Sequence, residues 1–441
     1  MKKTENISKL ISLILMVTPL IIFPFSINGD YFYLPKLIFV GILFLFMVLI
    51  HILSPERKKI KLDLITKLII LYFIFVIIST IFSVDPMESV FGARKREEGL
   101  ITIFLYLGLF LFTKTYYKFD KKHLYGFFIT SILVCIYGFL QFFGLDFIPR
   151  DIIRNAPIWN DRIFSTIGNP NFLGSYLILS LPVSMYIYLK NNKKYILFIN
   201  VLLFSILIIT RTRSAWLAFI FILFMFLIYV KKNPKFFRSF VVLISVFTIS
   251  FVILNINKDQ EYLSRFKSIK EDVNLIKEKT INQKEKDLSY LRAGSSRIYV
   301  WEKSFELILE RPLFGYGLEK LKKVIIEKYY FEMIDTFGGI QPFDRAHNEY
   351  LHIAVSTGLP SLFCYLLFLF LSLKKGFQRL KKEKYYFPIL VAICAYLIQA
   401  FFNISVVSVA YIYWIFLGLL VNEKILEKDE NKIVSKHLEK Q

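Results

Sequence analysis

The chain has 441 residues, of which 56% are hydrophobic and 17% aromatic, and its formal net charge is +22. The mean hydropathy is +0.53. Many apolar runs exceed the ~18 residues that cross a bilayer core as a helix. These values exclude an ordinary soluble enzyme. Because Lys and Arg gather between the apolar runs, the positive charge orients membrane spans and does not indicate nucleic acid as a partner.

The apolar runs predict an all-α polytopic membrane protein with about twelve transmembrane helices. No small-residue cleavage site follows the first run, so we expect it to remain as an anchor. Cys135, Cys364 and Cys394 all fall inside predicted spans, where they are packing residues. The predicted spans are 10–28, 34–53, 64–83, 100–117, 124–146, 172–189, 195–211, 214–230, 238–256, 350–373, 386–404 and 406–422.

The charges of the short loops predict the orientation of the spans. Counted from a cytoplasmic N-terminus, the even loops are rich in Lys and Arg, as cytoplasmic loops are. We therefore expect a multi-pass protein of the cytoplasmic (inner) membrane with both termini in the cytoplasm. The ninth loop then lies outside, in the periplasm or the extracellular space. The even loops are 55–61, 118–123, 190–194, 231–238 and 374–384.

This topology divides the chain into four parts. Helices one to nine occupy residues 1–256, and a large external helical loop follows at 257–349. Helices ten to twelve occupy 350–422, and a cytoplasmic tail covers 423–441.

Several arginines lie on the outer face, where the orientation of the spans does not require them. Arginine at a membrane boundary suits phosphate, because its planar fork binds phosphate oxygens bidentately and stays ionised. The alternative is an interfacial cation whose side chain extends to water. The outer cations of loops three, five and seven are Arg94, Lys95, Arg96, Arg150, Arg154, Arg162, Arg211 and Arg213.

The end of loop five predicts a helix start. Asn169 is an N-cap candidate and Pro170 suits the first helical position. A plain helix start at the membrane face explains the Asn-Pro-Asn pattern equally well.

The external stretch from Arg297 to Pro360 is polar and runs into a new apolar span. Ser296 can cap a helix that begins at Arg297. Arg297, Trp301, Phe305 and Ile308 would then share one face of that helix. The pair 311–312, Arg-Pro, should end this helix, and Gly-Tyr-Gly at 315–317 should form a tight turn.

Two histidines lie on the outer side. His347 precedes the tenth span, next to Asp344, Arg345 and Glu349, and spacing alone does not raise it above a structural histidine. His352 should point away from His347 and serve packing. The chain has no phosphate-cradling loop, no HExxH and no CxxC motif, and no Asp-x-Asp pair lies on the outer face. We therefore expect no metal and no cofactor.

Four segments together resemble the O-antigen ligase and O-antigen polymerase family of bacterial envelope enzymes. Their order, the spacing between spans and the large late external loop match the family's plan, and the resemblance covers most of the chain. The segments are FGARKREEGL (91–100), RIFSTIGNPNFLGSYL (162–177), TRTRSAWLAF (210–219) and the pair RIYVWEKSFELILERPLFGYGLEKL (297–321) with AHNEYLHIAVSTGLPSL (346–362).

The resemblance implies a GT-C-like, metal-independent, inverting glycosyltransferase in contact with membrane lipids. Its donor would be a glycan on undecaprenyl pyrophosphate, and its acceptor a hydroxyl of another glycan or of the lipid A core. Positions that match the family's motifs imply that Arg213 and Arg297 bind the pyrophosphate and that His347 activates the acceptor. Arg162 and Arg96 match the family's other arginines more loosely.

The same motifs supply the remaining expected substrate-binding residues, which are Asn169, Asn171, Trp301 and Asn348. The motifs do not separate a ligase from a polysaccharide polymerase or from an enzyme that glycosylates protein side chains. Two readings from other classes also stay open: a twelve-span transporter and a structural membrane protein whose arginines contact lipid head groups.

Overall fold

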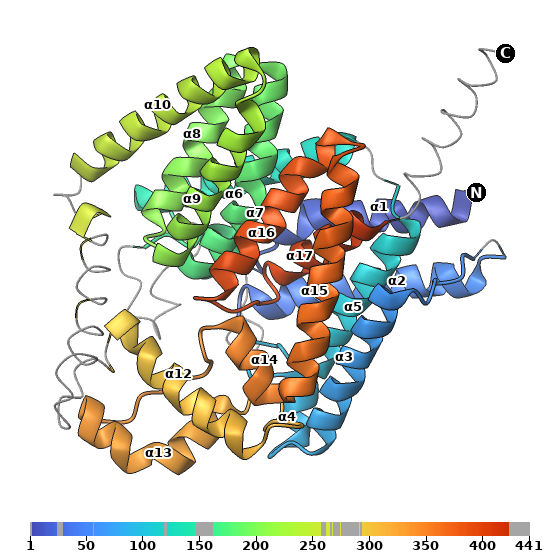
Figure 1. The fold of residues 1–441 in the computed structure, drawn as a ribbon, viewed down its shortest axis with the longest axis vertical. Coiled ribbons are helices and arrows are strands. Elements are labelled where there is room, and N and C mark those ends of the chain that lie inside the picture. Colours follow the sequence, from blue (N-terminus) through green and yellow to red (C-terminus); the bar gives the residue numbers. More distant parts are fainter. Residues whose placement is uncertain are drawn as a thin grey trace.

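Helices form most of the described chain in this computed structural model (Figure 1). The structure describes residues 2–23, 30–55, 57–118, 121–146, 162–256, 262–264, 267, 274, 291 and 293–422. The expectations for Arg150, Arg154 and the tail at 423–441 lie outside the described residues.

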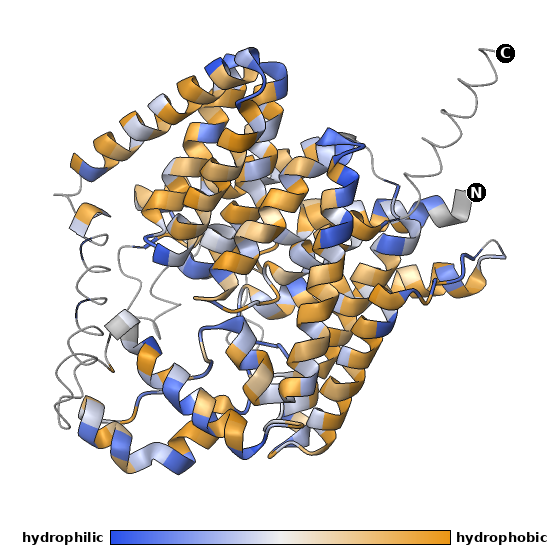
Figure 2. Ribbon diagram, viewed as in Figure 1, coloured by the Kyte–Doolittle hydropathy of each residue, from blue (hydrophilic) through white to orange (hydrophobic). Residues whose placement is uncertain are grey.

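The described helices confirm a polytopic α-helical membrane protein. Seven of them are long and apolar enough to cross a membrane, and four shorter apolar helices accompany them. The long helices are α2 (Tyr33–Leu53), α3 (Leu64–Ile81), α6 (Lys121–Phe142), α7 (Pro170–Asn191), α9 (Arg213–Val230), α10 (Pro234–Ile256) and α15 (Leu359–Leu380). The shorter ones are α5 (Leu100–Tyr116), α8 (Lys194–Ile209), α16 (Phe387–Ala400) and α17 (Ala410–Val421). Apolar residues cover the outer surfaces of the long helices (Figure 2).

Two predicted spans differ from the observed helices. The first helix, α1, runs from Lys2 to Val17 and is followed by the short 3-10 helix η1 (Thr18–Leu20), so the described part of the predicted span at 10–28 is not one continuous α-helix. Pro19 explains this end, because a proline ring cannot continue an α-helix. The predicted span at 350–373 is two helices, α14 (Glu349–Thr357) and α15, separated at Gly358.

The helix α7 lies at the centre of the bundle and is buried along the whole of its span. It packs against α6, α8, α9 and α16. Close approach to α9 depends on Gly174, because a Cβ atom there would lie 3.0 Å from the Cβ of Ala215. Lipid tails are as apolar as the helix surfaces, so the hydrophobic effect does not drive membrane helices together. Small residues such as glycine instead let the backbones approach closely and pack.

A smaller helical unit covers one end of the bundle. It consists of α12 (Ala293–Glu310) and α13 (Leu321–Phe337), which lie beside α14 and the short helix α4 (Pro86–Phe91) at the bottom of Figure 1. We call α12, α13 and the turn between them the lid. The lid has its own apolar core, which includes Tyr299, Leu307, Ile325 and Met333.

The turn between α12 and α13 fastens the lid to the break between α14 and α15. The backbone N–H groups of Tyr316 and Gly317 donate to the carbonyl oxygens of Val355 and Ser356 at 3.0 and 2.9 Å. These bonds satisfy carbonyls that the end of α14 would otherwise leave without partners. The turn predicted at 315–317 is therefore confirmed, with positive φ angles at both of its glycines.

Ion pairs and a further backbone bond hold the same turn. The buried ammonium of Lys320 pairs with Glu88 and lies 3.5 Å from Asp85, so it ties the lid to the start of α4. The N–H of Leu359 donates to the carbonyl of Pro312 at 2.7 Å. The lid is thus joined to the bundle where α3, α4, α14 and α15 meet.

Candidate functional site

The candidate site begins at the junction between the lid and α14. Asn348 caps α14, and its Oδ1 accepts hydrogen bonds from the N–H groups of Tyr350 and Leu351 at 3.0 and 3.1 Å. His347 precedes this cap with a φ of +48°, a left-handed conformation that residues other than glycine rarely adopt. The Asn348 cap fixes the start of α14, and it therefore fixes the position of the His347 imidazole just before that helix.

The imidazole of His347 stands among charged groups that keep it neutral. Burial and then the Arg297 guanidinium lower the pKa of His347 to about 4, with Arg96 and Arg345 adding to this and Asp344 opposing it. The ring is therefore uncharged at neutral pH and can accept a proton. The structure thus brings the predicted residues Arg297, Arg96 and His347 into one electrostatic group.

Asp344 joins this group to the segment between α3 and α5. Its carboxylate accepts from the Arg96 Nε at 2.8 Å and lies 2.6 Å from the Nη2 of the same residue. Burial alone would raise the pKa of Asp344, but Arg96 and Arg345 outweigh it and hold that pKa below its usual value. The side-on bond leaves the Arg96 guanidinium over the ring of Phe172, 5.9 Å from its centroid.

A second group of predicted residues surrounds the start of α7. Arg162 donates through Nε to the carbonyl of Thr210 at 2.9 Å and through Nη2 to the Oδ1 of Asn171 at 2.9 Å. Its Nη2 also lies 3.2 Å from the Oγ1 of Thr212. Arg213 follows as the first residue of α9. Through these hydrogen bonds, Arg162 holds the turn between α8 and α9 against the start of α7.

The start of α7 confirms the predicted cap. The Oδ1 of Asn169 accepts from the N–H of Asn171 at 2.8 Å, and Pro170 is the first helical residue. Because Asn171 contacts the second group and Phe172 contacts Arg96, the first turn of α7 lies between the two groups. Tyr33 supports the same turn by donating to the carbonyl of Gly168 at 3.4 Å.

Trp301 links the lid to α16. Its indole N–H donates to the carbonyl of Ala346 at 2.9 Å, next to His347. Its ring packs against Phe401 and Phe402, with centroids 5.6 and 6.1 Å apart. Trp301 therefore positions the His347 segment.

The face of α12 that carries Trp301, Phe305 and Ile308 is not buried as a whole. Phe305 is 59% exposed, whereas Ile308 is buried. The buried stripe of the helix includes Val300, Ser304 and Leu307, and Val300 and Leu307 belong to the apolar core that α12 shares with α13 and α14. The helix also begins at Ala293, earlier than predicted, and its end before the Arg-Pro pair is confirmed.

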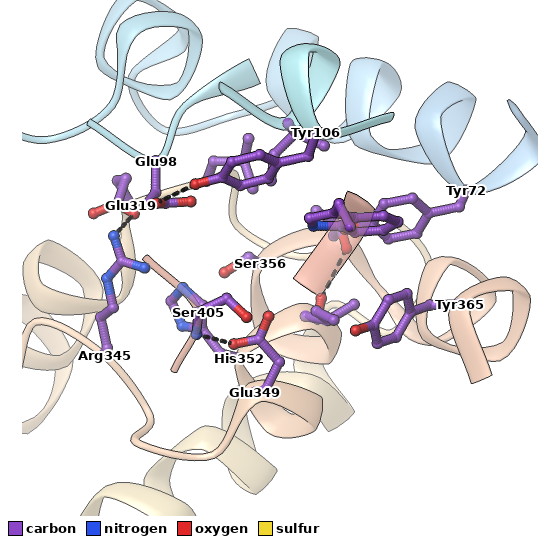
Figure 3. Close-up of a pocket in the computed structure, with 15 residues that line it drawn as sticks. Tyr72, Glu98, Tyr106, Glu319, Arg345, Glu349, His352, Ser356, Tyr365 and Ser405 are labelled. Carbon is purple, nitrogen blue, oxygen red and sulfur yellow. Dashed lines mark hydrogen bonds and ion pairs between the residues drawn. The ribbon is translucent and has the colours of Figure 1, made fainter. Parts of the chain in front are cut away.

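A polar cavity of about 50 Å³ lies beside the His347 segment, and sequence reasoning did not find it (Figure 3). Arg345 and Glu319 form a buried ion pair at one side of it. The hydroxyl of Tyr106 donates to Glu98 at 2.8 Å, and the N–H of Ser405 donates to Glu349 at 2.6 Å. These carboxylates come from three distant stretches of the chain, so no local spacing could have revealed them.

His352 also lines this cavity. It lies within electrostatic range of His347, Asp344 and Arg345. The expectation that it points away from His347 and only packs is therefore incomplete: it is buried, but it faces a polar space. Among the described residues, no group of three or more His, Cys, Asp or Glu side chains is arranged to hold a metal ion.

Part of this chain is similar to a named protein family. A family model described as O-antigen ligase matches residues 198–366. This range includes Arg213, Arg297 and His347. A curated relative, the general O-oligosaccharyltransferase of Acinetobacter baylyi (strain ATCC 33305 / BD413 / ADP1), is 21% identical over 232 residues. That match covers 52% of this chain and 37% of the relative, so the chain spans well under half of the relative's length.

Proposed function

We propose, from the match of residues 198–366 to the O-antigen ligase family model, that the chain is a membrane glycosyltransferase. It transfers a glycan from undecaprenyl pyrophosphate to an acceptor hydroxyl at the outer face of the cytoplasmic membrane. The lid, within the external part at 257–349, faces outward, and both termini lie in the cytoplasm. Donor and acceptor head groups meet between the lid and the first turn of α7.

One observation carries this proposal: a neutral imidazole stands within a group of guanidiniums at the junction of lid and bundle. Arg297 is the foremost charged neighbour that keeps His347 neutral. A site that joins a proton acceptor to fixed positive charge suits displacement of an anionic leaving group by a hydroxyl.

The chemistry divides between the two kinds of side chain. The acceptor oxygen attacks the anomeric carbon, and the bond from that carbon to the pyrophosphate oxygen breaks. The departing electron pair leaves negative charge on the pyrophosphate, which Arg297 and Arg213 stabilise, while Arg96 is held nearby by Asp344. His347 accepts the hydroxyl proton. Direct displacement inverts the anomeric centre.

The roles of the other predicted residues follow from their contacts. Asn169 and Asn171 form the start of α7, and Arg162 is bonded to Asn171 there; the pyrophosphate end of the donor rests on this group. Trp301 and Asn348 hold the His347 segment, through the indole bond to Ala346 and the cap of α14. They act on substrate chiefly by fixing this geometry.

The acceptor defines three variants of the activity. Transfer to lipid A core is ligation, transfer to a growing repeat-unit polymer is polymerisation, and transfer to a protein hydroxyl is protein O-glycosylation. The Acinetobacter relative is named a general O-oligosaccharyltransferase, and for this reason we include protein O-glycosylation among the three candidate activities.

A deletion strain tests the proposal. Mass analysis of its envelope glycans should show donor that accumulates on the lipid carrier: long unlinked polymer for a ligase, single repeat units for a polymerase, and loss of glycan from protein for a protein glycosyltransferase. Wild-type chain should restore the product. His347→Ala and Arg297→Met should not, whereas Glu310→Gln, an exposed lid variant, should restore it.

The transporter reading gives the opposite result. Vesicles that contain the purified chain would then take up lipid-linked or free glycan, and His347→Ala would leave this flux unchanged. An unchanged envelope glycan profile in the deletion strain would refute the transferase and support a structural role.

A further inference from the structure

The cavity beside the His347 segment is lined by three carboxylates, those of Glu98, Glu319 and Glu349, and by the guanidinium of Arg345. Asp344 is paired with Arg96, and Glu319 with Arg345. Glu98 accepts a hydrogen bond from the Tyr106 hydroxyl, and Glu349 accepts from the N–H and the side chain of Ser405. Two buried carboxylates that share one small polar space cannot both be ionised without a large cost, so the space holds a proton.

Two buried imidazole nitrogens point to water in this region. The Nδ1 atoms of His347 and His352 have no hydrogen-bond partner among the described residues. His352 is 8% exposed and lines the cavity. Buried polar atoms without protein partners are commonly satisfied by internal water, and a cavity of about 50 Å³ exceeds the ~10–15 Å³ that one water requires.

We propose that His352, the cavity and Glu98 form a relay that carries away the proton that His347 takes from the acceptor hydroxyl. This inference rests on the proposed function. The O–H bond of the acceptor breaks and its proton binds His347. The proton then passes through His352 and cavity water to the ionised carboxylate of Glu98, which becomes a neutral acid, and His347 returns to its neutral form. Glu98 later loses the proton to solvent, and no redox partner takes part.

The direction of the relay agrees with the local electrostatics. Burial raises the pKa of Glu98 to about 8, and the neighbouring Arg345 and Tyr106 only partly offset this. A proton on His347, whose pKa is about 4, therefore moves downhill to Glu98. The charge of Arg345 acts on both His347 and Glu98, and its guanidinium stays protonated throughout.

The relay predicts a rise of activity with pH, because only ionised Glu98 accepts a proton. A carboxyl with a pKa of about 8 is ionised in roughly one molecule of eleven at pH 7 and in most molecules at pH 9. The charged and titratable groups that face Glu98 are Tyr72 on α3, Tyr106 on α5, Glu319 and Arg345 in the lid connections, Glu349 and His352 on α14, Tyr365 on α15 and Tyr396 on α16.

The experiment measures glycan transfer by the full chain in lipid nanodiscs. The donor is lipid-linked glycan extracted from the deletion strain, and the acceptor is the envelope fraction of the same strain. For wild type, kcat should rise about tenfold between pH 7 and pH 9. Glu98→Gln mimics the neutral acid, so it should fold normally, keep KM for donor and show a low kcat without this rise. Glu98→Asp should restore part of the rise, and Glu310→Gln should match wild type.

A spectroscopic readout separates this inference from the proposed function. Infrared difference spectra across pH 8 should show loss of a protonated carboxyl band in wild type and no such band in Glu98→Gln. A Glu98→Gln enzyme with the wild-type pH profile would overturn the relay while leaving the transferase intact. Wild-type protein that transfers no glycan at any pH would overturn the proposed function, and the relay with it.

Discussion

Gly358 separates α14 from α15, and adding one methyl group there should weaken the joint between lid and bundle. Its backbone has φ +86° and ψ 165°, a region that is essentially restricted to glycine. A Cβ atom at this position would overlap the carbonyl oxygen of Leu313. That carbonyl belongs to the same turn that caps α14, so Gly358→Ala strains the backbone and pushes the turn away.

The expected cost has two parts. An L-residue in such a backbone region costs about 1–3 kcal/mol. Overpacking against a fixed neighbour costs about another 1–3 kcal/mol. The sum, about 2–6 kcal/mol, is a large fraction of the ~5–15 kcal/mol that holds a typical native protein together. Two other glycines separate the contributions, because a Cβ atom at Gly338 or Gly339 would meet nothing within 4 Å.

Gly338 has a φ of +74°, so Gly338→Ala should cost only the left-handed strain of about 1–2 kcal/mol. Gly339→Ala should cost less than about 0.5 kcal/mol. The assay heats purified protein with a maleimide dye that reacts with the buried thiols of Cys135 and Cys364 once they are exposed. The transition temperatures should fall in the order Gly339→Ala, Gly338→Ala, Gly358→Ala. Equal temperatures for the first and last variants would refute the reasoning.

Three further predictions use the same preparation. Lys36→Met removes a buried ammonium that donates to three backbone carbonyls, so the thermal transition should fall by the equivalent of about 1–3 kcal/mol or more; an unchanged transition would contradict this. Glu319→Gln leaves Arg345 buried without its paired carboxylate and should cost about 3–5 kcal/mol, whereas the exposed Glu310→Gln should cost at most about 1 kcal/mol in the same scan. The native state with His347 at a pKa of about 4 binds fewer protons than the unfolded chain. Stability should therefore fall as pH drops from about 6.5 towards 4, and His347→Gln should flatten this part of a pH–stability curve.

Hydropathy predicted the bundle well but missed its interruptions. A run of apolar residues reports that a segment avoids water, and it does not report backbone angles, so 350–373 reads as one span. The Thr-Gly-Leu-Pro sequence at 357–360 held the missing signal, because Pro360 belongs in the first turn of a new helix. The first helix was misplaced for a similar reason, since Pro19 ends it inside an otherwise apolar run.

The candidate site could be predicted only in part. The cap at Asn169 and the turn at 315–317 depend on residues that are adjacent in the chain, so the sequence alone could predict them. The association of Arg96 with Asp344, and of Glu98 with the cavity, depends on loops that are distant along the chain. In the segment FGARKREEGL the prediction rested on the arginines, yet the residue that lines the cavity is Glu98.

The burial of α7 has a consequence for how the chain is made. Synthesis proceeds from the N-terminus, so α7 enters the membrane long before α16, which forms one of its principal neighbours. Until residues 387–400 emerge, lipid must occupy the face that α16 will cover. The hydrogen bond that Asn403 donates to the hydroxyl of Ser175, at 3.1 Å in the complete fold, also cannot form until Asn403 has been made. A nascent chain that stops before α16 therefore presents an incomplete centre to the quality-control machinery of the membrane, and the C-terminal helices act as the closing step of assembly.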